Sequence, residues 1–150
     1  IWNLRGQPGA SMTKGGVGLR GEVGHNLLGK DLPYAKIIDS APRIDPVTGL
    51  ATEVRSIKTH QLYNYQEPGA LAAQLKAEVD ELRKFTTTTA GGTTITAARN
   101  AERVLVIGVP PGQLEAAAGK GLTAQWRAEA QEAIEYAHKK GVRIVFKAIK

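Results

Sequence analysis

The sequence predicts a single α/β domain with a central mixed β-sheet, in which a long β-hairpin is flanked by helices. Three observations support this prediction. The chain has 150 residues, the length of one ordinary domain. Hydrophobic residues make up 42% of it, enough to build a core although there is no cysteine for a disulfide. Helical and strand-like hydrophobic patterns follow one another in the order helix, hairpin, helix, strand, helix, strand.

The chain begins with a polar, glycine-rich segment, residues 1–15, which has no hydrophobic period and is interpreted as a linker or leader. The first residue is Ile1 rather than Met, so we expect the domain to be part of a longer protein. The folded domain is expected over residues 16–150, and its first element is a helix over residues 17–28. Apolar residues recur in that helix at every fourth position, at Leu19, Val23 and Leu27.

A β-hairpin is predicted after this helix. Residues 34–38 form its first strand, and residues 50–62, which alternate in polarity and contain β-branched residues, form its second strand. The turn lies in the segment DPVTG at residues 45–49, because proline presets one backbone angle and glycine supplies a positive one.

The second half of the chain predicts two amphipathic helices and two strands. The first helix covers residues 70–85, with Leu71, Leu75, Val79 and Leu82 on one face. A Thr- and Gly-rich stretch at residues 86–96 is compatible with a short strand or a mobile loop. A strand is expected at residues 103–109, a helix at residues 122–140, and a last strand at residues 142–149.

The net charge of the chain is +6, and such a field attracts polyanions, although many basic domains bind no nucleic acid. The absence of cysteine excludes a disulfide framework and a cysteine-based zinc site. No run of about 18 apolar residues occurs, so we expect no transmembrane helix. Basic residues near the end of the chain either contact a nucleic acid backbone or form a solvated helix face. They are Arg127, Lys139, Lys140, Arg143 and Lys147.

Pairing across the predicted hairpin brings candidate site residues together. If the chain folds about residues 46–49, residues whose numbers sum to about 95 face each other, which places Asp39 opposite Ser56. Lys58 is two positions from Ser56 and therefore shares its face. The preceding helix carries Glu22, which could supply a second carboxylate.

Such a cluster is suited to phosphodiester cleavage, because two carboxylates can hold a divalent cation and a lysine can stabilise charge on the phosphate. The plainer interpretation is an ordinary cross-strand ion pair between Asp39 and Lys58, worth under about 1 kcal/mol. Geometry alone favours the plainer one. Asp45 is a competing acidic candidate, but its position at the turn favours a structural role. His60 shares the face of Lys58 and could bind phosphate or metal, although an isolated strand histidine more often faces solvent.

A resemblance to a known family favours the catalytic cluster over the ordinary ion pair. The segments AKIID at residues 35–39, DPVTGLA at residues 45–51 and RSIKT at residues 55–59 resemble the core of the C-terminal toxin domains of contact-dependent growth inhibition (CdiA-type) proteins. Those domains belong to the PD-(D/E)xK nuclease superfamily. Their hairpin similarly carries an Asp, a TG.A turn region and an S-[IV]-K-[ST] motif, and Glu22 matches the Glu of their preceding helix. The resemblance covers roughly residues 16–110, and the remainder in outline.

Carried over by position, the resemblance implies that Glu22 and Asp39 are metal ligands and that Lys58 is the motif lysine. Ser56 stands where the superfamily usually has its second acidic residue, a departure that weakens the metal assignment. The implied catalytic set is therefore Glu22, Asp39, Ser56 and Lys58. The implied cofactor is a divalent metal ion, Mg²⁺ first, with Zn²⁺ or Mn²⁺ as alternatives.

The function implied by the resemblance is that of a toxin nuclease that cleaves RNA, with tRNA as the first expectation. A DNase of the same fold and a non-catalytic nucleic-acid-binding module are the alternatives. A cognate immunity protein is implied as a partner, and its surface is expected to be acidic because this domain is basic. The resemblance also implies delivery from the cell surface as part of a larger secreted protein, action in the target-cell cytoplasm, and no stable membrane association of this domain.

Overall fold

The computed structural model describes residues 1–4, 19–114 and 121–150. Its elements follow one another as a helix, two strands, a short 3-10 helix, a helix, two strands, a helix and a strand. They are α1 (Leu19–Leu28), β1 (Ser40–Ile44), β2 (Ala51–Thr59), η1 (Leu62–Asn64), α2 (Ala70–Arg83), β3 (Thr87–Ala90), β4 (Thr93–Val109), α3 (Gly121–Lys139) and β5 (Val142–Ala148). No helix among these described parts is long and apolar enough to cross a membrane.

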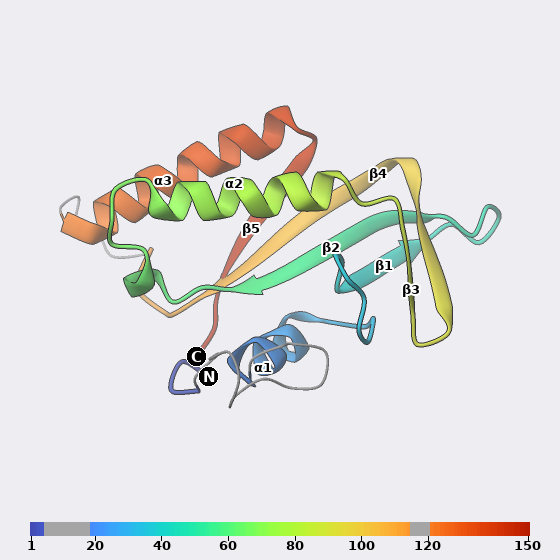
Figure 1. The fold of residues 1–150 in the computed structure, drawn as a ribbon, viewed down its shortest axis with the longest axis horizontal. Coiled ribbons are helices and arrows are strands. Elements are labelled where there is room, and N and C mark those ends of the chain that lie inside the picture. The colour runs from blue at the N-terminus through green and yellow to red at the C-terminus, as the bar shows by residue number, and fades with distance from the viewer. Residues whose placement is uncertain (5–18, 115–120) are drawn as a thin grey trace.

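The strands form one mixed sheet of five strands, between two helical layers (Figure 1). The strand order is β1-β2-β4-β3, with β5 also paired to β4. β2, β4 and β5 are parallel to one another, whereas β1 is antiparallel to β2 and β3 is antiparallel to β4. The helices α2 and α3 lie together on one side of the sheet, and α1 lies on the other side, against β2 and β4. The predicted single α/β domain with a mixed sheet and flanking helices is confirmed.

Most predicted elements coincide with observed ones. The two amphipathic helices predicted in the second half of the chain are α2 and α3, and the last strand is β5. The Thr- and Gly-rich stretch forms β3 and the start of β4, so it is a hairpin rather than a loop. Residues 5–15 of the predicted linker, and residues 17 and 18 of the first predicted helix, lie outside the described residues. The backbone nitrogen of Ile1 lies 2.8 Å from the carbonyl oxygen of Lys150, so residues 1 and 150 lie side by side (Figure 1).

The predicted strand at residues 34–38 was wrong, because this segment is a loop and β1 begins only at Ser40. The backbone amides of Asp31 and Leu32 both donate to the Asp39 carbonyl at 3.1 Å, which closes the intervening residues into a compact loop. Tyr34 has a φ of 60°, outside the extended region that a strand needs. Ile38 is buried without strand pairing, which explains why this apolar run imitated a strand.

The register of the hairpin agrees with the pairing arithmetic. Ser40 pairs with Arg55 and Ile44 pairs with Ala51, with small irregularities between these pairs. At the turn, the Asp45 side chain accepts hydrogen bonds from the amides of the second and third residues after it, at 2.8 and 3.3 Å. Asp45 therefore has the structural role expected for an Asx turn.

The core is divided unequally by the sheet. The larger cluster lies beneath α2 and α3, and its fully buried members include Leu71, Leu75, Val79, Leu82, Trp126 and Ala133. The smaller cluster, on the α1 side, contains Ile57, Val104 and Val106, with Leu28 and Val145 packed against it. Among the described residues, this smaller cluster and a close contact with β2 hold α1 against the sheet.

Gly24 provides that contact, and this predicts a specific packing defect. A Cβ atom at Gly24 would lie 2.3 Å from Cγ2 of Thr59. The substitution Gly24→Ala should therefore lower the free energy of unfolding by about 1–3 kcal/mol, as measured by urea denaturation. The double variant Gly24→Ala/Thr59→Ser lacks the clashing methyl group and should recover most of the loss. Equal destabilisation of the single and double variants would contradict this packing.

Candidate active site

A cleft of about 490 Å³ opens between α1, the loop at residues 30–37 and β2. Three of the four site residues predicted from the sequence, Glu22, Asp39 and Lys58, line this cleft. Glu22 comes from α1, Asp39 from the end of the loop and Lys58 from the last part of β2. The fold thus brings together residues from three separate segments.

Asp39 is held in place by hydrogen bonds from both its backbone and its side chain. Its amide donates to the Arg55 carbonyl at 2.7 Å, and its Oδ2 accepts a hydrogen bond from the Ile57 amide at 2.7 Å. Because β1 begins one residue later, the carboxylate takes the place of a strand carbonyl at this edge of β2. Only 9% of Asp39 is exposed, so the bond to Ile57 offsets part of the cost of burying the charge.

His25 is a cleft residue that was not singled out from the sequence. It lies on α1 one turn after Glu22, and its Nδ1 is 3.5 Å from Oδ1 of Asp39. Burial lowers the pKa of His25 below its usual value, and the charges of Lys30 and Lys58 lower it further, against the opposing effects of Asp39 and a hydrogen bond with the Ile57 backbone. The ring is therefore neutral near pH 7. The signal available in the sequence was the spacing of three residues from Glu22, which places both side chains on one helix face.

Ser56 is not among the described residues that line the cleft. It is 2% exposed, and in register it lies beside Leu105 of the larger core cluster. Its two chain neighbours, Arg55 and Ile57, supply the backbone groups that hold Asp39. The pairing of Asp39 with this part of β2 is as expected, whereas a catalytic role for the Ser56 hydroxyl stays a prediction.

The donor atoms of the cleft fit a divalent cation. Glu22 and Asp39 contribute carboxylates, and His25 contributes a buried Nδ1 that has no hydrogen-bond partner among the described residues. Oxygen and imidazole nitrogen atoms are the ordinary ligands of divalent metals in proteins. Within the described ranges no three His, Asp or Glu side chains are already gathered closely enough to hold a metal, so binding would have to draw them together.

His60 neither faces solvent nor lines the cleft. It is 8% exposed, and its Nε2 lies 2.9 Å from both carboxylate oxygens of Glu78 on α2. Its Nδ1 lies 3.0 Å from the hydroxyl of Tyr65. The expectation of a solvent-facing histidine was therefore wrong, and His60 joins β2 to the helical layer opposite the cleft.

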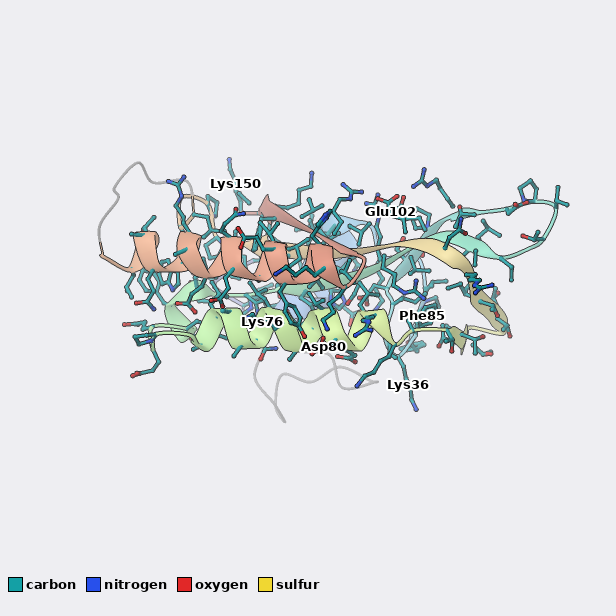
Figure 2. The ribbon with its side chains drawn as sticks, turned by 90° about the horizontal axis from the view of Figure 1, so that it is seen from above. Lys36, Lys76, Asp80, Phe85, Glu102 and Lys150 are labelled. Atoms are coloured by element: carbon teal, nitrogen blue, oxygen red, sulfur yellow. The ribbon has the colours of Figure 1, made fainter. Side chains whose placement is uncertain are left out.

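The basic residues near the end of the chain do not surround the cleft. Arg127, Lys139 and Lys140 lie on or directly after α3, in the layer on the other side of the sheet (Figure 1). Arg143 is paired with Glu102 at 2.7 Å. Among the described residues, the cations that line the cleft are three lysines, of which Lys36 projects from the body of the molecule (Figure 2). The other two are Lys30 and Lys58.

Comparison with known proteins adds two findings. A family model described as "CDI toxin restriction endonuclease-like domain" matches residues 20–147. Among solved structures, the chain is similar to one from the "CdiA-CT/CdiI toxin and immunity complex from Yersinia pseudotuberculosis", with a TM-score of 0.63 and 20% identity. That match covers 85% of this chain and 98% of the other and, at this identity, shows a shared fold. No curated protein matches the chain.

The buried His25 predicts a loss of stability in mild acid. Its pKa is lower in the folded protein than the usual 6.5, so the unfolded chain takes up the proton first as the pH falls. Stability should therefore decrease as the pH drops through 6.5 and continue to decrease until the lower, folded pKa is reached. Urea denaturation in EDTA from about pH 7.5 to about pH 5.5 should show a smaller decrease for His25→Gln than for the wild type. Identical pH dependence of the two proteins would contradict the assignment.

Proposed function

Because the chain belongs to the family of CDI toxin restriction endonuclease-like domains, where CDI is contact-dependent growth inhibition, we propose that its cleft is the active site of a metal-dependent nuclease. The observation that supports the location is the convergence of Glu22, Asp39 and Lys58 in the cleft between α1 and β2. Two carboxylates beside a lysine suit phosphodiester cleavage.

Each residue of the cleft has a role in this proposal. Glu22 and Asp39 hold the cation, with Asp39 fixed by the Ile57 amide so that its second oxygen faces the cleft. Restriction endonuclease-like folds usually use divalent metals, and a bound divalent ion supplies Lewis acidity toward a phosphate oxygen. The Lys58 ammonium stabilises negative charge as it develops on the phosphate. Ser56, buried between the two residues that hold Asp39, is kept as the fourth residue of the proposed catalytic set, with a smaller contribution than Asp39 or Lys58 because it does not line the cleft.

The substrate is a nucleic acid, and two polymers are candidates. The resemblance of the hairpin motifs puts tRNA first. DNA is the second candidate, because the family is described as restriction endonuclease-like and restriction endonucleases cut DNA. The same constellation of carboxylates and lysine can cleave the phosphodiester bonds of either polymer, so the choice rests on experiment.

A cognate immunity protein is the proposed partner. The similar solved chain comes from a toxin and immunity complex, and this chain shares its fold. The net charge of +6 favours an inhibitor with an acidic surface. In this proposal a larger CdiA-type protein delivers the domain from the cell surface, and the domain acts in the cytoplasm of the target cell.

Substitution in the cleft should abolish cleavage without unfolding the domain. The purified domain is incubated separately with total tRNA and plasmid DNA, in Mg²⁺ or Zn²⁺ and then in EDTA. Asp39→Asn and Lys58→Ala should each lower the cleavage rate by about 100-fold or more, and Ser56→Ala should lower it less. Lys84→Ala, an exposed lysine at the end of α2, is the matched control and should cleave like the wild type.

The polymer that is cut decides between the two substrates. Discrete tRNA fragments that require metal and Lys58 support the first candidate, and DNA degradation with intact tRNA supports the second. Unchanged cleavage by Asp39→Asn or Lys58→Ala would show that the site lies elsewhere. If the domain binds nucleic acid without cleaving it, and EDTA does not affect that binding, the domain is a nucleic-acid-binding module and not a nuclease.

Electrostatic docking of the immunity protein predicts strong salt dependence. The association rate of the purified domain with its inhibitor, followed by stopped-flow fluorescence, should fall by about tenfold or more when NaCl is raised from about 0.05 to about 0.5 M. The dissociation rate should change much less, because it depends on short-range contacts. An association rate that does not respond to salt would contradict an acidic partner surface.

A further inference from the structure

A large aromatic side chain is left exposed in the cleft. Tyr34 lies in the loop at residues 30–37, lines the cleft and is 69% exposed. Its φ of 60° lies in the left-handed region, and among the residues that the structure describes it is the one residue other than glycine with a positive φ. A bulky residue in this region stores backbone strain, and such strain concentrates at binding and catalytic sites.

The loop is anchored on both sides of Tyr34. Leu32 is buried in the larger apolar cluster, and Ala35 and Ile37 pack against the same cluster. The Leu32 amide also donates to the Asp39 carbonyl at 3.1 Å. The apolar residues of this segment are thus directed into the core, whereas Tyr34 stays outside it. A ring so exposed gains little from packing, so the stability of the fold does not explain a tyrosine at a strained position.

The surroundings of Tyr34 suit a nucleotide. Lys30 and Lys36 line the same cleft, and Lys36, two residues after Tyr34, projects from the body of the molecule (Figure 2). Proteins hold single-stranded nucleic acid with this combination, in which an aromatic ring stacks on a base and cations contact the phosphates. The cleft volume of about 490 Å³ lies within the range of small-ligand sites, roughly 300–1,000 Å³.

We propose that Tyr34 is a stacking platform for a nucleobase and that the cleft takes an unpaired nucleotide, with Lys36 at its phosphate backbone. This inference rests on the proposed nucleic acid substrate and narrows it to single-stranded segments. In a duplex both faces of each base are covered by neighbouring bases, so a base meets the Tyr34 ring only where it is unpaired. Every base has a face that can stack, so the inference holds for RNA and for DNA.

A comparison of normal and abasic strands tests the stacking. Binding of the full chain to a fluorescent single strand of DNA of about eight nucleotides, and to a strand of the same length without bases, is measured by anisotropy in EDTA at low salt. Tyr34→Gly should weaken binding of the normal strand by about 10-fold or more and leave binding of the abasic strand unchanged. Tyr34→Phe keeps the ring and should bind like the wild type. Lys36→Ala should weaken both strands by the same factor, because both carry phosphates.

Two further variants separate the ring from the backbone strain and from exposed aromatic rings in general. Tyr34→Ala also lacks the ring but keeps a Cβ atom at a positive φ, so it should bind like Tyr34→Gly and unfold at a lower urea concentration. Tyr34→Ala that binds as tightly as the wild type would overturn the inference. Tyr63→Ala is the matched control, because Tyr63 is 57% exposed but packs against the Trp126 ring. It should bind both strands like the wild type.

The outcomes distinguish failure of this inference from failure of the proposed function. If Tyr34→Gly weakens both strands equally, or neither, Tyr34 does not stack on a base and the inference is overturned, while the cleavage assays still decide the nuclease. Wild-type protein that binds neither strand would likewise overturn the single-stranded substrate. If the base-dependent loss is found and no polymer is cleaved, the inference holds and the nuclease function fails.

A second measurement needs no variant. The ring proton resonances of Tyr34 should move upfield when the normal strand is added in EDTA, because a base stacked on the ring shields them, and they should stay in place with the abasic strand. Ring resonances of Tyr34 that do not move at saturating normal strand would overturn the assignment.

Discussion

The hydrogen bond from the Ile57 amide to the Asp39 carboxylate is the interaction on which the rest of the site depends. Asp39 lies one residue before β1 begins. Its carboxylate therefore accepts the Ile57 amide of β2, which a backbone carbonyl of a neighbouring strand would otherwise accept. The Asp39 carbonyl also accepts the amides of Asp31 and Leu32, which closes the loop that forms one wall of the cleft. Asp39 thus holds two segments together: its carboxylate binds the Ile57 amide of β2, and its backbone carbonyl closes the loop.

The other wall of the cleft is α1, which packs on the smaller of the two apolar clusters that the described residues form. In the described part of the chain, the cluster on the α1 side contains three buried residues, whereas the cluster beneath α2 and α3 is much larger. The seating of α1 therefore relies on Gly24 against Thr59, and the same helix carries Glu22 and His25. Elements held by few buried contacts open at low free-energy cost, so α1 is the wall of the cleft that would move if the proposed cation binds.

The sequence predicted the parts of the fold and site that depend on local chemistry. Turn chemistry at Asp45 set the register of the hairpin, and that register correctly placed Asp39 against β2. Period-two alternation predicts that Ser56, Lys58 and His60 share one face of β2, yet Lys58 lines the cleft whereas His60 pairs with Glu78 of α2 on the opposite side. Alternation also does not say which face is covered, so the burial of Ser56 and His60 was not foreseen. His25 was missed because its importance comes from the distance to Asp39, a contact between segments that no local pattern records.

Anomalous diffraction from crystals of the chain soaked in Mn²⁺ would test the central claim most directly, because Mn²⁺ scatters anomalously and substitutes for either Mg²⁺ or Zn²⁺. The claim is that the cleft beside Asp39 is a metal-dependent nuclease centre. It predicts an anomalous peak in the cleft within about 2.0–2.4 Å of Asp39 Oδ1. A well-occupied peak elsewhere on the chain, with none beside Asp39, would contradict it.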